Sequence, residues 1–300
     1  MALTQYNATG KTFDLTKGIT MISPDDTPLM SLFGRAEPAT QVIHSWEEEE
    51  LGDPKDNAQI EGFTYSPEEP GDTTLKDNVC QIFSRGYKVT DTNQAIKRYN
   101  VKDYLARKMQ QAMKLLALDV EKAITANTKK ISGNASTARK MAGLQYYVKT
   151  NVSTAVSARA LTYDLLNDMF ENIYKCGGNP DVVAVSPRNK RIISLLLPLS
   201  TERSQPAGQK KLVQTIDVIE GDFGRKRIVT DRWIDNEKAY VLSTDYCKLS
   251  YLRPFKTVDL PKTADQVAKQ ITGELTLEVR AEKASGIIDK LNGTLPSAAE

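Results

Sequence analysis

The chain has 300 residues, of which 40% are hydrophobic, so it is long enough for one or two domains with a real core. Forty Lys and Arg against 38 Asp and Glu leave a net charge of +2 and a pI near 8.2, below the value of about 9 that is typical of a dedicated nucleic-acid-binding domain. The first residues lack the basic and apolar run of a signal peptide, and no segment approaches the ~18 apolar residues that span a bilayer, so we expect no membrane association and a protein that stays in the cytosol.

The first 41 residues are polar and rich in helix breakers. Pro24, Pro28, Gly34 and Pro38 divide the segment into short pieces, and a small apolar cluster follows Pro28. This pattern predicts an extended N-terminal arm over residues 1–41, anchored by that cluster. A frayed terminus is the alternative.

Two strands of opposite direction are predicted at 42–46 and 80–90, because apolar and polar residues alternate in both. Between them, residues 47–72 hold ten acids and one base, Lys55, with Pro and Gly throughout. A connection of this length in a compact domain is usually functional or disordered. With strands at its base, it is best interpreted as a β-hairpin arm that projects from the body.

A long helix is predicted over residues 100–128, with Asn100 as N-cap and no Gly or Pro before Gly133. Its apolar stripe comprises Val101, Leu105, Met109, Ala112, Leu116, Val120 and Ala123. The opposite face, expected toward solvent or a neighbouring subunit, comprises Asp103, Arg107, Gln110, Lys114, Glu121 and Thr125. An ordinary core helix of an α/β domain would show the same pattern.

The next segment predicts a small unit of helices and strands. Residues 143–150 suggest a short strand or turn, and a second helix is expected from Ser157 to Lys175. An apolar strand at 181–185 leads through Ser186 to Pro187, which suits the first position of a helix.

The remaining chain predicts further strands. Gly221 and Gly224 are expected to form a hairpin turn with positive φ, flanked by 212–219 and 226–230. Short strands are expected at 239–243 and 249–252. The clean alternation over 274–282 predicts a half-buried strand, and a loose tail follows from residue 293.

Residues that carry common chemistry are scarce. His44 is the only histidine, so a His-rich metal site is impossible, and we expect a structural role for it. There is no Gly-x-Gly pair for a dinucleotide and no complete phosphate loop. Three distant cysteines, Cys80, Cys176 and Cys247, suit buried free thiols. We therefore expect no catalytic residue, no cofactor and no metal site, and predict that the protein is not an enzyme.

Charged clusters are instead the candidate contacts between subunits. The acidic candidates are Glu47, Glu48, Glu49 and Glu50, and the basic candidates are Arg225, Lys226 and Arg227. A second possible basic partner is formed by the residues around the start of the long helix, namely Lys97, Arg98, Lys102 and Arg107. The alternative is that the acidic run is merely a solvated face.

The order of these segments resembles that of the major capsid proteins of tailed bacteriophages with the HK97-like fold. The stretches that carry the resemblance are Thr27-Pro28-Leu29-Met30 before Trp46-Glu47, the helix at 100–128, and the strand, Ser-Pro step and helix at 179–196. The resemblance implies an α+β chain with an N-terminal arm (1–41), an extended β-hairpin loop (42–97), a peripheral domain with a long spine helix (98–157 and 253–291), an axial domain (158–252) and a C-terminal tail (292–300).

The resemblance also implies a structural subunit that self-assembles through pentamers and hexamers into an icosahedral virion shell around double-stranded DNA. Assembly would take place in the host cytoplasm, with possible scaffolding, portal and decoration proteins as partners and weak, non-specific contact with the packaged DNA. A cellular encapsulating shell of the same fold is the first alternative. A soluble enzyme of unrecognised type is the second.

Overall fold

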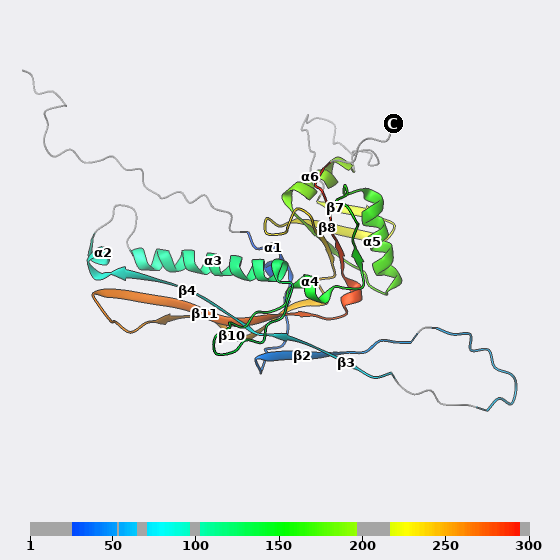
Figure 1. The fold of residues 1–300 in the computed structure, drawn as a ribbon, viewed down its shortest axis with the longest axis horizontal. Helices are drawn as coiled ribbons and strands as arrows, with labels where there is room; N and C mark the ends of the chain where they lie inside the picture. The colour runs from blue at the N-terminus through cyan, green and yellow to red at the C-terminus, as the bar shows by residue number, and fades with distance from the viewer. Residues whose placement is uncertain (1–25, 53, 65–70, 97–102, 197–216, 295–300) are drawn as a thin grey trace, which may run out of the picture.

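The structure is a computed structural model that describes residues 26–52, 54–64, 71–96, 103–196 and 217–294 (Figure 1). Its helices are α1 (Pro28–Leu32), α2 (Asp91–Ala95), α3 (Tyr104–Ala126), α4 (Leu144–Tyr147), α5 (Tyr163–Lys175), α6 (Pro187–Leu196) and the 3-10 turn η3 (Glu282–Ala284). The first strands are β1 (Gly34–Arg35), β2 (Ile43–Glu48), β3 (Thr74–Val79), β4 (Gln81–Thr90), β5 (Val152–Ser153) and β6 (Val182–Val185). The others are β7 (Val218–Gly221), β8 (Gly224–Thr230), β9 (Ala239–Leu242), β10 (Cys247–Asp259), β11 (Gln266–Val279) and β12 (Gly286–Ile288).

A long four-stranded sheet forms one half of the molecule. Its strand order is β1-β10-β11-β4, and β11 runs antiparallel to both β10 and β4. Helix α3 lies along this sheet and packs mainly on β4 (Figure 1). The apolar stripe of α3 and the inner residues of the sheet bury one another, with Leu116 at 1% exposure and Leu275 and Leu277 at 0%.

The spine helix α3 is shorter at its start than predicted. Its N-cap is Asp103, whose carboxylate accepts a hydrogen bond from the Ala106 amide at 3.0 Å, so the prediction of Asn100 as the cap is wrong. Asn100 itself lies outside the described residues. The predicted stripe is confirmed from Leu105 to Ala123, whereas Glu121 and Thr125, expected on the outer face, are buried.

The projecting hairpin is confirmed, but with a different second strand. β2 pairs antiparallel with β3, which lies at 74–79, and residues 81–90 of the predicted second strand form β4 of the four-stranded sheet instead. Only Cys80 separates β3 from β4, so one nearly continuous extended segment belongs first to the hairpin and then to the four-stranded sheet. The hairpin extends to the right in Figure 1, away from α2 and the far end of β4.

A six-stranded sheet forms the other half, in the order β5-β12-β9-β6-β8-β7. It packs with α5 and α6, and its β6 is fully buried, as the apolar run predicted. Pro187 begins α6 as expected. The predicted start of the second helix is wrong, because α5 begins at Tyr163 with Thr162 as its cap and not at Ser157. Of the short strand or turn predicted at 143–150, residues 144–147 form the one-turn helix α4.

Several details of the second half also differ from the sequence-based expectations. β10 has 13 residues where a short strand was expected at 249–252. β11 is buried on both faces near its end, because Glu274, Thr276 and Glu278 are covered as well as the apolar residues between them. The hairpin turn between β7 and β8 is confirmed, but positive φ occurs only at Gly224 (88°), not at Gly221.

The thiols are all free, as expected, but not all buried. Cys80 and Cys247 are buried, whereas Cys176 is exposed at the end of α5. Burial raises the pKa of the Cys80 thiol to about 11, so this thiol is protonated at neutral pH and is a poor nucleophile.

The two halves are joined at a waist, where Tyr240, Leu242 and Ile287 of the six-stranded sheet share a buried apolar core with the other half. There the chain passes between the sheets three times: from α4 to β5, from β9 to β10 and from β11 to β12. The three crossings touch one another. The Arg280 amide donates to the Tyr246 carbonyl at 2.9 Å, and the Glu282 carboxylate accepts from the Lys149 amide and the Thr150 hydroxyl, both at 2.7 Å.

A buried polar network adds a direct contact across the waist. The Tyr240 hydroxyl of β9 donates to the Thr125 carbonyl at the end of α3, at 3.1 Å. The Gln145 side chain of α4 donates to the same carbonyl at 2.7 Å and to the Tyr240 oxygen at 2.8 Å. These bonds satisfy groups that would otherwise be buried without partners.

The predicted segment boundaries do not all coincide with the sheets. The boundary at 252/253 falls inside β10, and β12, which the peripheral range included, pairs with β9 and β5 in the six-stranded sheet. The range 42–97 for the extended loop includes β4, which belongs to the four-stranded sheet. Strand pairing therefore ends the hairpin near residue 79.

Candidate assembly surfaces

The hairpin arm is the part of the molecule with the least support from its own chain. All described residues from 49 to 75 are exposed. Four large apolar side chains lie among them, with exposed fractions of 98% for Leu51, 80% for Ile60, 48% for Phe63 and 68% for Leu75. Exposed apolar groups next to many acids form a surface that suits a partner better than water.

The four acidic candidates at the start of the arm are not equivalent. Glu47 and Glu49 are exposed. Glu48 forms an ion pair with Lys76 of β3 at 2.8 Å and also accepts from the Trp46 indole at 3.0 Å. Glu50 reaches Lys283 at 2.6 Å. Two of the four acids are thus engaged within the subunit.

The three basic candidates on β8 also separate into two kinds. Arg225 and Arg227 are exposed. Lys226, between them, is only 2% exposed and donates to the Asn179 side chain at 2.7 Å, with its ammonium 6.0 Å from the centre of the Phe170 ring. Burial lowers the pKa of Lys226. The structure places the acids and these bases in different halves of the subunit, so it does not bring them together within one chain.

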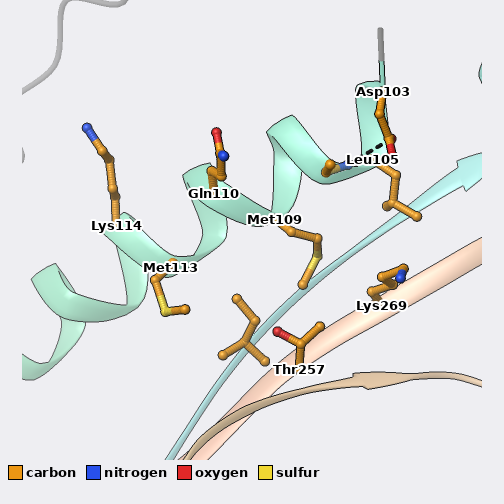
Figure 2. A pocket seen from close by; sticks show the side chains of 10 residues that line it. Asp103, Leu105, Met109, Gln110, Met113, Lys114, Thr257 and Lys269 are labelled. Atoms are coloured by element: carbon orange, nitrogen blue, oxygen red, sulfur yellow. Dashed lines mark hydrogen bonds between the residues drawn. The ribbon is translucent and has the colours of Figure 1, made fainter.

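An apolar groove lies between α3 and the outer part of the four-stranded sheet (Figure 2). It has a volume of about 460 Å³. Met109 and Met113 point from α3 toward the strands, Thr257 lies opposite them, and Gln110 and Lys114 point away. Met113 is 49% exposed, which leaves one side of the groove open to solvent.

The short helix α1 is attached to α3 by one buried carboxylate. Glu121 accepts hydrogen bonds from the amides of Leu29 at 2.7 Å and Met30 at 2.8 Å, and its own exposure is 0%. Burial raises the pKa of Glu121 to about 7. The Trp233 indole, which comes from the other half, donates to the Asp26 carbonyl at 3.4 Å. The start of the described chain therefore contacts both halves.

The described residues hold no cluster of metal-binding side chains. No three His, Cys, Asp or Glu side chains in these ranges lie close enough to hold a metal ion. His44 lies in β2 and pairs with the buried Glu278 at 3.1 Å, a contact that joins the hairpin base to β11. Among the described helices, none combines the length and the apolar character needed to cross a bilayer.

Sequence reasoning missed the groove and the buried role of Glu121. Met109 and Met113 are four residues apart on a predicted helix, and Met is common at adaptable binding surfaces, so one local signal existed. The other wall of the groove comes from 257–271, for which there was no such signal. Nothing local to Glu121 indicates its partners, because they lie more than 90 residues away in sequence.

Known proteins resemble this chain over nearly its whole length. A family model described as SU10 major capsid protein matches residues 2–292. The major capsid protein of Escherichia phage Phieco32 is 24% identical over 343 aligned positions, which cover 94% of this chain and 95% of that protein.

Solved structures show the same arrangement of elements. The capsid asymmetric unit of cyanophage A-1(L) has a TM-score of 0.71 at 12% identity and covers 96% of this chain and 99% of its own. The holo-SrpI encapsulin complex from Synechococcus elongatus PCC 7942 has a TM-score of 0.61 at 12% identity, with 96% of each chain covered. At these identities the likeness shows the fold alone, and it confirms the predicted α+β, HK97-like capsid fold. Because the family model spans almost the entire sequence, the chain belongs to the SU10 major capsid protein family and is a major capsid protein of a tailed-phage shell.

Proposed function

We propose that copies of this chain assemble through pentamers and hexamers into a closed icosahedral shell around double-stranded DNA, with a purely structural, non-enzymatic role. The hairpin arm carries this proposal, because every described residue from 49 to 75 is exposed. Because the arm is so exposed, contacts with its own chain contribute little stabilising free energy to offset the conformational entropy that is lost when the arm becomes ordered. The surface of a neighbouring subunit would supply the missing contacts. Contacts between different patches of identical chains close into rings when the rotation allows it.

The two sheets suggest how a subunit would sit in such a ring. In this proposal the four-stranded sheet with α3 is the peripheral domain, and the six-stranded sheet with α5 and α6 is the axial domain at the ring centre. The separate strand pairing of the two sheets supports the division, and one face of the six-stranded sheet packs against the other half. The tail at 292–300 and the arm at 1–41 would make further contacts. Scaffolding, portal and decoration proteins are the expected partners, and assembly would take place in the host cytoplasm.

The direct test is negative-stain microscopy and sedimentation of the purified protein, alone and with a scaffolding partner from the same source. Rings, shells or tubes are expected. A protein that stays monomeric at high concentration with that partner present would contradict the proposal. Packaged DNA would favour the phage shell, whereas a packaged cargo enzyme would favour the encapsulating-shell alternative.

Charge segregation gives a second, sharper test of assembly. We propose that the acidic run docks on a basic surface of the neighbouring subunit, formed by Arg225 and Arg227 or by bases near the start of α3. Each exposed pair contributes only about 0.2 to 1 kcal/mol, but every subunit of a lattice would repeat it. Particle yield should then decrease with added salt.

The unequal environments of the four acids allow a matched pair of variants. Replacing Glu47 and Glu49 with Gln removes only exposed charge, whereas replacing Glu48 and Glu50 also breaks contacts inside the subunit. Docking predicts fewer particles for the first pair, with an unchanged circular dichroism spectrum. Equal particle yield and stability for that pair would show that the acidic run is a solvated face.

A further inference from the structure

The base of the hairpin arm lies on the segment that carries the chain from the four-stranded sheet to the six-stranded sheet. This segment comprises residues 278–283, from the end of β11 into η3, and we call it the crossing segment. The hairpin base makes three side-chain contacts with it: His44 to Glu278 at 3.1 Å, Glu48 to the Ala281 amide at 3.2 Å and Glu50 to Lys283 at 2.6 Å. A movement of the hairpin base therefore acts directly on the crossing segment.

The crossing segment is in turn bonded to the six-stranded sheet. The Asn151 side chain donates to the Lys283 carbonyl at 2.6 Å, and the Asn151 carbonyl accepts from the Ile287 amide of β12 at 2.9 Å. A continuous series of contacts thus leads from Glu48 of the hairpin to β12. Such a series carries energetic coupling between two sites when one element in it has two discrete arrangements.

The backbone of Ala281 is strained in a way that gives the crossing segment such an element. Its φ of 48° and ψ of 68° lie in the left-handed region, where a Cβ is unfavourable and which glycine occupies freely. Within the described ranges, Lys290 is the other non-glycine residue with positive φ. Such a conformation persists only where the surrounding contacts determine it. For Ala281 one of these contacts comes from the hairpin, through the bond of its amide to Glu48.

The position of the Glu48 side chain is fixed by the rest of the hairpin base. Its carboxylate pairs with Lys76 on the facing strand at 2.8 Å and accepts from the Trp46 indole at 3.0 Å. The Trp46 ring lies against the Tyr147 ring with 5.6 Å between centroids, and the Tyr147 hydroxyl donates to the Asp77 carbonyl at 2.9 Å. The Glu48 carboxylate therefore moves with the hairpin base as one unit.

We propose that Glu48 and Ala281 couple the position of the hairpin base to the packing of β12 in the six-stranded half. With the hairpin base in the described position, the Glu48 carboxylate holds the Ala281 amide and the left-handed turn is stable. When the base moves away, this amide loses its partner and Ala281 returns to a negative φ, which changes the direction in which the chain enters β12. Coupling is reciprocal, so a change at β12 also loosens the hairpin base. The inference goes beyond assembly, because it concerns the single subunit.

Hydrogen exchange of the unassembled full-length subunit tests this inference whether or not particles form. Glu48→Ala removes the carboxylate that holds Ala281. Glu47→Ala is the matched control, because it makes the same charge change at the neighbouring, exposed position of β2. By mass spectrometry, the amides of residues 286–288 are expected to exchange about tenfold faster in Glu48→Ala than in wild type, as for the loss of a hydrogen bond to a charged group. Glu47→Ala should leave them unchanged. Faster exchange that is confined to the hairpin would overturn the inference.

The second experiment asks whether Glu48 acts through the conformation of Ala281. Glycine adopts positive φ without the cost of a Cβ, so in an Ala281→Gly background the turn no longer depends on Glu48. Adding Glu48→Ala there should accelerate exchange at 286–288 by less than about threefold. Lys290→Gly is the control background, because it makes the same kind of change at the other left-handed position and should retain the full acceleration. Equal acceleration in the Ala281→Gly and wild-type backgrounds would show that Glu48 only supports the hairpin, and would overturn the inference.

Circular dichroism shows whether each variant is folded. If Glu48→Ala does not fold, Glu48→Gln takes its place in both experiments, with Glu47→Gln as its control. Gln keeps an oxygen at this position but carries no charge, and a hydrogen bond to a neutral acceptor is roughly half as strong. The expected acceleration at 286–288 is then about threefold, and an unchanged exchange rate there would equally overturn the inference.

Discussion

Replacing Glu121 with Gln tests the most heavily buried carboxylate contact of the fold. Glu121 is fully buried under α1, and burial raises the pKa of its carboxyl from 4.5 to about 7, with the negative charge of Asp231 adding to the effect. Between these two values the folded chain binds a proton that the unfolded chain has released. The contribution of Glu121 to the free energy of unfolding is therefore largest below pH 4.5 and is lost as the pH rises to about 7.

The size of the effect follows from the two pKa values. One pKa unit corresponds to 1.36 kcal/mol, so the full loss is about 3 kcal/mol, of which about 2.5 kcal/mol falls between pH 5 and pH 8. Gln has nearly the same shape but carries no charge at any pH. Its single side-chain oxygen can accept only one of the two amides of Leu29 and Met30 well, which lowers the free energy of unfolding by about 1 to 3 kcal/mol at every pH.

Urea unfolding of the unassembled subunit between pH 5 and pH 8 measures the difference between wild type and Glu121→Gln. We expect this difference to shift by about 2.5 kcal/mol in favour of Gln as the pH rises. Asp168→Asn, which removes an exposed carboxylate from α5, controls for the change in net charge. A difference that stays constant within about 1 kcal/mol, or that drifts in the opposite direction, would refute the reasoning.

Three further outcomes are expected. Leu116→Ala leaves a cavity between α3 and the sheet and should lower the free energy of unfolding by about 2 to 5 kcal/mol in urea titrations; a loss below about 1 kcal/mol would contradict the packing described. Asn78→Ala removes the hydrogen bonds to the Ala142 amide and to the carbonyls of Ala142 and Leu277, and should lower the free energy of unfolding by about 2 to 4 kcal/mol. Proteolysis at the base of the hairpin should also increase, and a hairpin that stays uncut would contradict this expectation. Duplex DNA should bind weakly in gel-shift assays, without sequence preference and with steep loss between 50 and 200 mM salt; sequence-specific binding at the higher salt would count against this expectation.

The sequence predicted elements whose pattern is local. The stripe from Leu105 to Ala123 is buried as its spacing of three and four residues indicated, and Pro187 begins α6 because its fixed φ suits that position. Glu121 and Thr125 fall on the polar side of the same helix, yet they are covered by α1 and by the segment after β8. No spacing rule within the helix indicates which distant segments will cover its other face.

The same distinction, between patterns that are local in sequence and contacts that the fold creates, applies to the acidic and the basic surfaces. The acidic arm was recognisable because its charges are contiguous in sequence. The segments 81–95, 103–115 and 253–272 together hold nine bases and four acids, and this surplus of positive charge emerges only when the fold brings the three segments together. For Lys226 a signal did exist: a strand alternates faces, so Lys226 had to point away from the face that carries Arg225 and Arg227.

The waist between the two sheets has a mechanical consequence for a shell of many subunits. All three chain crossings lie beside one another and are tied together by the bonds of Arg280 and Glu282. A small rotation about this point would change the tilt of one sheet against the other while every strand pair within each sheet stayed intact. Such a rotation would have to shift the apolar core that the two halves share, in which Tyr240, Leu242 and Ile287 of the six-stranded sheet pack with residues of the other half. Fitting one sequence to sites of different curvature would then require side-chain shifts in this core, with no change in strand pairing.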